Sequence, residues 1–204
     1  MTNRTTKPLG PALGEQHDLF ATPRLSGLSL FEDGVSQAEE RTLIAAIDGV
    51  ELSPFRFQGW LGKRLTAAYG WSYDFDRGGL EPALPLPGWL QPLRERAARL
   101  AGLSVAELAQ ALLIRYDPGA GIGWHRDRPV FGEIVGVSLG TPATMRFRRR
   151  RSNGFDRASV YLPPRSIYHL TGDARRLWEH SIVPMDDPRR SVTFRSLGSR
   201  SEST

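Results

Sequence analysis

Two histidines and one aspartate in this sequence could together hold a metal ion. The segment WHRD contains His125 and Asp127, and His180 follows well downstream in WEHSIVP. We expect WHRD to lie on a strand, where residues i and i+2 point to the same side, so that an imidazole and a carboxylate project together. Two histidines and one carboxylate leave the opposite positions of a metal open, as in the non-haem iron(II) oxygenases. Those positions could take a 2-oxo acid and O2.

A second group of residues could bind the organic co-substrate. In the segment RRSVTFR, residues 189–195, Arg189 and Arg195 are an even number of positions apart, so on one strand they share a face with Ser191 and Thr193. A guanidinium forms a planar, two-pronged pair with a carboxylate. A buried arginine near the metal would therefore bind the distal carboxylate of 2-oxoglutarate.

Each of these signals has a plainer interpretation when it is taken alone. An H-x-D tripeptide is short and commonly marks a surface turn or a strand pair that binds no metal. Arg189 and Arg195 are also what a solvated basic edge strand would carry. His169, in SIYHLTG, is expected to be a hydrogen-bonded core or wall residue, and His17 lies in a polar N-terminal segment, so neither is counted as a ligand.

The elements that must position these residues are helices followed by many short strands. Capping boxes predict helices at about 36–48 and 104–111, and an apolar pattern predicts another at 90–100. Short strand-like segments then recur with turns between them: ALLIRY, EIVGVSL, ATMRFRR, ASVYLPP, SIYHLTG, HSIVP and SVTFRSL. This order predicts an α+β domain whose core is a β-sandwich or jelly roll.

The length of 204 residues suits one domain, which we expect at 26–197. Residues 1–25 are polar and proline-containing, which predicts a disordered arm, and residues 198–204 predict a flexible tail. Within the domain, residues 55–80 are expected to form short strands and turns, and residues 111–197 the jelly-roll core.

Composition indicates the kind of partner and excludes some chemistry. The formal charge of +5 and the pI of about 10.1 favour a polyanion such as nucleic acid. Arginines cluster between two predicted strands, where we expect them to contact a nucleic-acid backbone; they are Arg146, Arg148, Arg149, Arg150 and Arg151. The absence of cysteine excludes disulfides, thiolate metal sites and cysteine nucleophiles. Because no apolar run has the length of a membrane span or signal peptide, we expect a cytoplasmic protein with no membrane contact. We also expect a monomer.

In their order and spacing, these segments resemble the AlkB family of iron(II)- and 2-oxoglutarate-dependent dioxygenases. The matching segments, within residues 55–197, are RYDPGAGIGWHRD, IVGVSLGTPATMRF, LPPRSIYHLTGDARRLWEH and RRSVTFR. The resemblance implies the double-stranded β-helix of that family, a jelly roll with N-terminal helices and a nucleotide-recognition lid at about 55–80.

The resemblance also implies roles for individual residues. Arg189 would pair with the 5-carboxylate of 2-oxoglutarate, and Arg195 would lie near the metal-binding end of this co-substrate. Tyr116 would hydrogen-bond the co-substrate, and Ser191 would take the position of a family asparagine. Iron(II) would be held by His125, Asp127 and His180.

Other positions match or depart from the family pattern. Gly172 and Arg175 match its G-x-x-R turn before the distal histidine. Ile114 replaces the asparagine of the family's N-x-Y motif, which loses one polar contact to the co-substrate. Pro129 stands where the bacterial repair enzyme has an acidic residue that helps to read the damaged base. We therefore expect a substrate preference that differs from that of the best-known member.

The segment GKRLTAAYGWSYDF resembles the lid that grips the nucleotide in several AlkB homologues, one branch of which acts on a tRNA wobble uridine. By this resemblance, Lys63 and Arg64 would contact phosphates, and Tyr69, Trp71 or Tyr73 would stack on a base. The alternative is that these aromatic residues form the core of their own strands.

The resulting expectation is an enzyme that oxidatively dealkylates N-methylated bases, of the 1-methyladenine or 3-methylcytosine type, in single-stranded or flipped-out DNA or RNA. Its products would be formaldehyde, succinate and CO2. Three alternatives stay open: the same chemistry on a modified tRNA uridine or a protein, a catalytically silent nucleic-acid-binding module, and a cupin-like metalloprotein with other chemistry.

Overall fold

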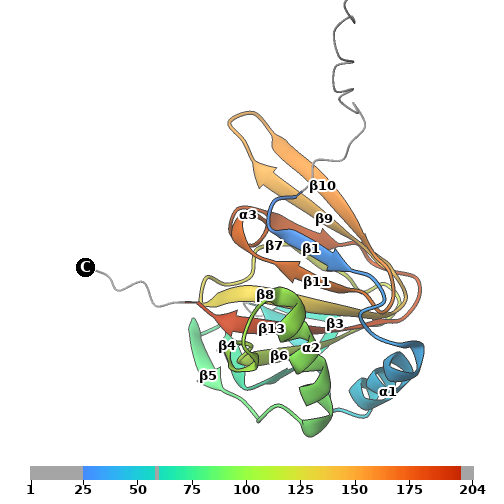
Figure 1. Ribbon diagram of the computed structural model, residues 1–204. Helices are drawn as coiled ribbons and strands as arrows, with labels where there is room; N and C mark the ends of the chain where they lie inside the picture. Colours follow the sequence, from blue (N-terminus) through green and yellow to red (C-terminus); the bar gives the residue numbers. More distant parts are fainter. Residues whose placement is uncertain (1–24, 58–59, 199–204) are drawn as a thin grey trace, which may run out of the picture.

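The computed structural model describes residues 25–57 and 60–198, which form two facing β-sheets with helices against the back of one of them (Figure 1). The predicted arm at 1–25 and tail at 198–204 fall outside the described residues, apart from Leu25 and Gly198.

The larger sheet has seven strands within the described residues, in the order β1-β11-β8-β13-β6-β3-β2. Their bounds are Leu28–Phe31 (β1), Ile167–Leu170 (β11), Phe131–Gly140 (β8), Arg189–Leu197 (β13), Gln110–Tyr116 (β6), Trp60–Tyr69 (β3) and Ser53–Phe57 (β2). The smaller sheet has the order β10-β9-β12-β7. Its strands are Phe155–Leu162 (β10), Ala143–Arg150 (β9), Glu179–Ile182 (β12) and Ile122–His125 (β7).

From β6 onwards the chain crosses repeatedly between the two sheets. Strands β6, β8, β11 and β13 belong to the larger sheet and β7, β9, β10 and β12 to the smaller one, with antiparallel pairing throughout. This alternation is the double-stranded β-helix, so the predicted jelly roll is confirmed.

Two of the three predicted helices form where the patterns placed them. Helix α1 spans Gln37–Asp48, and its N-cap Ser36 accepts a hydrogen bond from the backbone N–H of Glu39. Helix α2 spans Gln91–Ala101, after a 3-10 turn at Gly88–Leu90 (η1).

The prediction of a helix at 104–111 is wrong. Its capping box forms, with Ser104 and Glu107 bonded to each other, but only one 3-10 turn follows, at Val105–Glu107 (η2). Strand β6 begins at Gln110 and pairs with both β13 and β3, so sheet hydrogen bonds take up the backbone that a longer helix would have used.

The hydrophobic core has an outer and an inner part. The outer part packs α1 and α2 against the back of the larger sheet, and the inner part lies between the two sheets. Because side chains alternate along a strand, β13 gives Val192 and Phe194 to the outer core. Its other face, which carries Arg189 and Arg195, points between the sheets.

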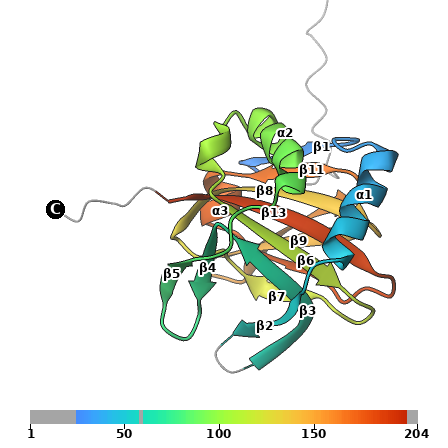
Figure 2. The same cartoon turned by 90° about the horizontal axis from the view of Figure 1, so that it is seen from below.

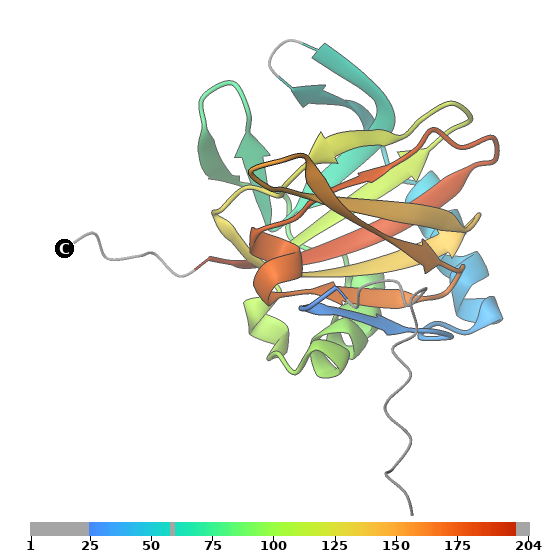
Figure 3. The ribbon, with the colours of Figure 1, turned by 90° about the horizontal axis from the view of Figure 1, so that it is seen from above.

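Two hairpins form the predicted lid region. Strands β2 and β3 make one hairpin, and β4 (Trp71–Asp74) and β5 (Gly79–Pro82) make the other. Both project from the same side of the molecule (Figure 2, Figure 3). None of the described helices is both long and apolar enough to cross a membrane.

The arginine-rich segment was expected between two strands. The structure places most of it within a strand instead. Arg146, Arg148, Arg149 and Arg150 are part of β9 itself, and only Arg151 follows it. The apolar residues Met145 and Phe147 extend the strand, because they alternate with the arginines and are buried.

Candidate active site

His125, Asp127 and His180 meet between the two sheets. One ligand atom from each side chain lies within 4.8 Å of the others. The imidazole centroids of His125 and His180 are 4.3 Å apart, and Nε2 of His180 is 3.5 Å from Oδ2 of Asp127. This donor set fits an iron(II) ion with part of its coordination sphere open.

The elements hold the two histidines and the aspartate in different ways. His125 is the last residue of β7 and is the Cα partner of His180 on β12. Asp127 lies beyond the end of β7, so the expectation that the H-x-D tripeptide lies on one strand is wrong. The loop that carries Asp127 is held by side-chain hydrogen bonds instead of strand pairing.

Both histidines are in a protonation state that can bind a metal. Nδ1 of His125 lies 2.9 Å from the carbonyl oxygen of Gly123, which can only accept, so Nδ1 carries the proton and Nε2 is free to bind a metal. Burial lowers the pKa of His180 to about 3, and it also lowers the pKa of His125. Both imidazoles are therefore neutral near neutral pH, which is the form that binds a metal.

Asp127 is buried yet ionised. Burial alone would raise the pKa of its carboxyl group, but Arg195, with the two histidines and Arg175, holds that pKa well below its usual range. Nη2 and Nε of Arg195 donate to Oδ1 of Asp127 at 2.7 and 3.0 Å. The Oδ2 atom is the one that faces His180.

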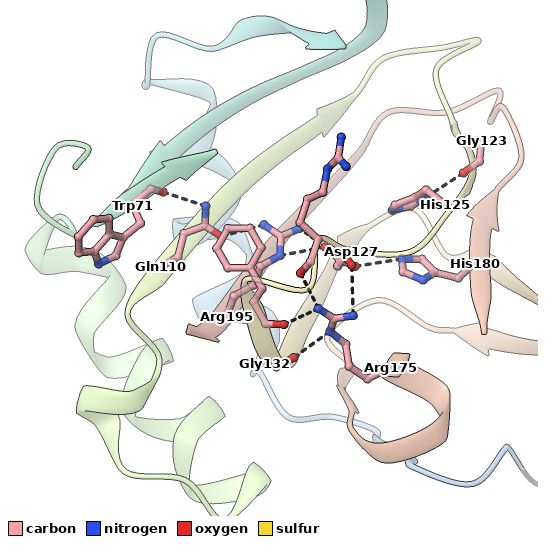
Figure 4. Close-up of polar contacts among 11 residues, drawn as sticks. Trp71, Gln110, Gly123, His125, Asp127, Gly132, Arg175, His180 and Arg195 are labelled. Atoms are coloured by element: carbon pink, nitrogen blue, oxygen red, sulfur yellow. Dashed lines mark hydrogen bonds and ion pairs between the residues drawn. The ribbon is translucent and has the colours of Figure 1, made fainter. Parts of the chain in front are cut away.

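Arg175 holds the loop that carries Asp127 (Figure 4). It lies on the short helix α3, Gly172–Arg176, and is almost fully buried. Its guanidinium donates to the carbonyl oxygens of Gly132, Arg128 and Asp127 at 2.8, 2.8 and 3.2 Å, and also to that of Phe131. The arginine of the G-x-x-R motif thus fixes the backbone that aims the metal-binding carboxylate.

Gln110 is a site residue that the sequence analysis missed. Its Nε2 donates to the backbone carbonyl of Trp71 in the lid at 2.8 Å, and its Oε1 accepts from Nη1 of Arg195 at 2.9 Å. A chain of hydrogen bonds therefore runs from the lid through Gln110 and Arg195 to Asp127 (Figure 4). The only sequence signal was a polar residue at the start of an apolar strand.

Arg189 fits the carboxylate-binding role that was predicted for it. The side chain is fully buried, and its Nη2 donates to Oγ of Ser138 at 3.1 Å. Within residues 25–57 and 60–198, its Nε and Nη1 have no hydrogen-bond partner. A buried guanidinium with unpaired donors is costly unless an anion completes it, so Arg189 suits the 5-carboxylate of 2-oxoglutarate.

Two tyrosines and a serine lie near Arg189. The ring of Tyr116 is 5.3 Å from Cζ of Arg189, and Ser191 is buried on the same face of β13. Tyr168, which was not predicted, lies across Gly136, where a Cβ atom would come within 2.0 Å of its ring. Burial raises the pKa of Tyr168 to about 12, so its hydroxyl group stays protonated and can donate a hydrogen bond.

A cavity of about 1350 Å³ opens over His125 and Asp127. Of the predicted lid residues, Arg64 and Tyr73 line it, and Phe75 lines it as well. Arg128 lies over both rings, 5.1 Å from that of Tyr73 and 5.2 Å from that of Phe75.

The other predicted lid residues lie elsewhere. Lys63 is exposed, since β3 turns Gly62 and Arg64 toward the cavity and Lys63 away from it. Tyr69 packs against the outer core, so base stacking by Tyr69 is not supported and the core alternative holds. Trp71 is not part of the cavity wall; its backbone carbonyl serves as the acceptor for Gln110.

Three of the five arginines that were predicted to contact a nucleic-acid backbone have acidic partners. Arg148 pairs with Glu179 at 2.6 Å, while Arg149 and Arg151 share Asp156 at 3.0 and 2.6 Å. Arg150 is exposed. Their contact with a nucleic acid stays a prediction.

Comparisons with known proteins agree with this geometry. Residues 28–200 match the family described as the 2OG-Fe(II) oxygenase superfamily. The alpha-ketoglutarate-dependent dioxygenase AlkB of Escherichia coli K12 is 30% identical over 153 residues, which cover 70% of this chain and 68% of that protein.

Another relative is a longer protein. The tRNA (carboxymethyluridine(34)-5-O)-methyltransferase alkbh8 of Xenopus tropicalis is 35% identical over 163 residues, or 78% of this chain, but the match spans only 25% of that relative. Among solved structures, OsALKBH1 superposes with a TM-score of 0.60 at 16% identity, covering 83% of this chain and 96% of that one. This likeness shows the shared fold.

Proposed function

The chain belongs to the AlkB family within the 2OG-Fe(II) oxygenase superfamily, and from this membership we propose that it oxidises alkylated bases in nucleic acids. It is a 2-oxoglutarate-dependent dioxygenase that uses iron(II), 2-oxoglutarate and O2. The proposed reaction removes an N-methyl group, of the 1-methyladenine or 3-methylcytosine type, as formaldehyde, with release of succinate and CO2. The base would be unpaired or flipped out of its duplex.

The observation that carries this proposal is the combination of rings and guanidinium groups in the cavity over the metal-binding residues. Tyr73 and Phe75 are in edge contact, with centroids 4.9 Å apart, and Arg128 lies over both. Arg64 lies over Phe55, with its Cζ 3.8 Å from the ring centre. Unstacked bases bind to such aromatic and guanidinium planes, while arginines also attract the phosphates.

Each residue of the site has a definite task in this reaction. When bound, iron(II) with 2-oxoglutarate and O2 supplies the oxidant for a C–H bond of the alkyl group. His125, Asp127 and His180 would hold the metal, and Arg189 would anchor the far carboxylate of the co-substrate. Arg195 keeps Asp127 ionised and oriented, at 2.7 Å.

A second candidate, oxidation of a modified uridine in tRNA, is favoured by the charge of the cavity. The described residues that line it include three acids, Asp127, Glu133 and Glu179, and six arginines. The arginines are Arg64, Arg126, Arg128, Arg175, Arg176 and Arg195. Bases such as 1-methyladenine are cationic near neutral pH, so this wall favours neutral or anionic bases instead.

Three further observations point the same way. Pro129, on the cavity wall, offers no acidic group to a cationic base. The Xenopus relative is named for a reaction on a carboxymethyluridine of tRNA, which is a base with a carboxylate. In the part of the chain that the structure describes, Nε of the half-buried Arg64 has no hydrogen-bond partner, so it can donate to an anionic group.

Paired oligonucleotides that differ in base charge test both candidates. We would compare 1-methyladenine with neutral 1-methylguanine, and 3-methylcytosine with neutral 3-methyluracil, each in the same single strand, alongside unfractionated tRNA. Mass spectrometry would follow the loss of a methyl group or the gain of an oxygen atom, with His125→Ala as the control. Methyl loss that requires His125 supports dealkylation, and oxygen gain on a tRNA uridine supports the second candidate. Succinate formation with peptides but with no nucleic acid would overturn both.

A further inference from the structure

The outer face of the smaller sheet carries alternating arginines and aromatic rings. We name this surface the arginine–aromatic groove and define it by Trp124, Arg146, Arg148, Arg150, Phe155 and Arg157. Helices α1 and α2 lie on the opposite side of the molecule and do not cover it (Figure 1, Figure 3). A hollow of about 320 Å³ lies within it, lined in part by Trp124, Arg146 and Arg157.

Strand geometry explains why these side chains gather on one face. In β7, His125 points inward to the metal site, so its neighbour Trp124 points outward. In β9, Phe147 is fully buried in the inner core, so Arg146 and Arg148 on either side of it point outward. In β10, Phe155 and Arg157 are two positions apart and share that face.

The guanidinium groups of the groove lie over its two aromatic rings. Arg146 and Arg148 lie over Trp124, with Cζ at 5.1 and 4.6 Å from the ring centre. Arg148 also lies 4.9 Å from the centre of Phe155, and Arg150 and Arg157 lie 5.8 and 5.7 Å from it. Stacking leaves guanidinium edges, which carry the N–H donors, free to meet an anion.

The groove is strongly cationic because few acids face it. Glu179 pairs with Arg148 at 2.6 Å, and Arg146 bonds to the neutral hydroxyl group of Ser181 at 3.1 Å. Within the described residues, Arg150 and Arg157 have no ion-pair partner. Asp156 points away from the groove to Arg149 and Arg151, since it alternates with Phe155 and Arg157.

Two arginines of the groove lie directly opposite each other. Arg148 and Arg157 are direct partners across the β9–β10 pair, and like charges opposite each other destabilise a sheet. A polyanion would relieve that repulsion. Trp124 also lines the active-site cavity, so the groove is continuous with the place where the base would be oxidised.

We propose that the arginine–aromatic groove binds the single-stranded segment next to the target base, with its phosphates on the arginines and a flanking base against Trp124. The inference rests on the proposed function for the identity of the strand. It adds a second contact surface beside the lid, joined to the cavity at Trp124. Stacking and phosphate contacts are both tolerant of sequence, so this surface would set affinity and strand position instead of base choice.

The test is the salt dependence of binding to a fluorescent single-stranded oligonucleotide without a modified base. The groove variant Arg150→Ser/Arg157→Ser removes two exposed arginines. The control Arg41→Ser/Arg99→Ser removes the same charge from exposed positions on α1 and α2. Each phosphate contact contributes about 0.7 to the slope of log affinity against log salt, so the groove variant should flatten this slope by about 1.4. The control should leave it nearly unchanged.

The outcomes separate this inference from the proposed function. Equal slopes for the groove variant and the wild-type protein, or equal flattening in both variants, would overturn the groove while leaving base oxidation intact. If the wild-type protein oxidises none of the bases but the groove variant still flattens the salt slope, the proposed function alone would be overturned. Arg157→Glu provides a second variant, which should weaken binding more than Arg157→Ser, and circular dichroism checks that each variant is folded.

Discussion

At the scale of single residues, the three side chains proposed to bind the metal are in the protonation states that metal binding requires. The histidines are neutral because they are buried, and Asp127 is ionised because Arg195 is bonded to it. The ligands therefore need not release protons when a metal binds.

This state predicts how metal binding depends on pH. The pKa of His180 is lowered to about 3, so its imidazole stays neutral in mildly acidic solution. Two histidines with an ordinary pKa of about 6.5 would lose about a thousandfold in metal affinity between about pH 7 and about pH 5. We expect a much smaller loss here, measured by calorimetric titration with Mn²⁺ as the probe. A thousandfold loss of metal affinity would show that the pKa values of the two histidines are not lowered.

Arg189 gives a prediction that separates binding from folding. The Arg189→Met variant removes a buried charge whose Nε and Nη1 are unpaired among the described residues, so the free protein should be no less stable. The same variant should lose the rise in melting temperature that 2-oxoglutarate causes in the Mn²⁺-loaded protein, since the anchor for the carboxylate is gone. Thermal melts with and without 2-oxoglutarate measure both quantities. A variant that melts lower and keeps the ligand shift would refute the assignment.

At the scale of elements, α3 acts through Arg175 on the loop after β7. The Arg175→Met variant would leave the carbonyl oxygens of Gly132, Arg128 and Asp127 without this donor. Losing a buried charged donor of this kind costs about 3 kcal/mol, and metal affinity should fall with it because Asp127 is no longer aimed. Urea unfolding and Mn²⁺ titration would test the two effects. Unchanged metal affinity would show that the loop keeps its shape without Arg175.

Gln110 links the lid to the metal site. Gln110→Glu keeps an acceptor for Arg195 but loses the donor to the carbonyl of Trp71. We expect it to loosen the lid, raising the KM for an oligonucleotide with little change in the KM for 2-oxoglutarate. Gln110→Leu loses both contacts and should raise both constants. If both variants raise only the KM for 2-oxoglutarate, the lid connection has no role.

Most elements could be predicted because local and tertiary preferences agree in them. Helix α1 has a cap and an apolar stripe, and the strands from β6 to β13 alternate or are continuously apolar. The helix at 104–111 could not be rejected, because its capping box is real and only pairing with β13 and β3 ends it after one turn.

For the site, the order of the motifs predicted His125, His180 and Arg189, but it gave no information about contacts made through space. Asp127 is aimed by Arg195 and Arg175, and Gln110 belongs to no motif. Likewise, the sequence could not show that Tyr69 faces the core and Tyr73 the cavity, because that depends on where β3 ends and β4 begins.

At the scale of the whole molecule, arginines gather both on the cavity wall and in the arginine–aromatic groove. The cavity wall and the arginine–aromatic groove meet at Trp124. This distribution predicts oligonucleotide affinity that falls steeply with salt and oxidation rates that rise with strand length until the groove is filled. Measuring the KM of strands of increasing length would test this, and a KM independent of length would argue that only the target nucleotide is bound.

The most direct test of the central claim is the stoichiometry of the reaction on a single-stranded oligonucleotide. The protein would be incubated with iron(II), 2-oxoglutarate and a methylated strand, and succinate and demethylated base would be counted by mass spectrometry. We predict that the two form in equal amounts and that both are lost in His125→Ala and Arg189→Met. Succinate that forms at the same rate with and without nucleic acid, with no base altered, would contradict the account.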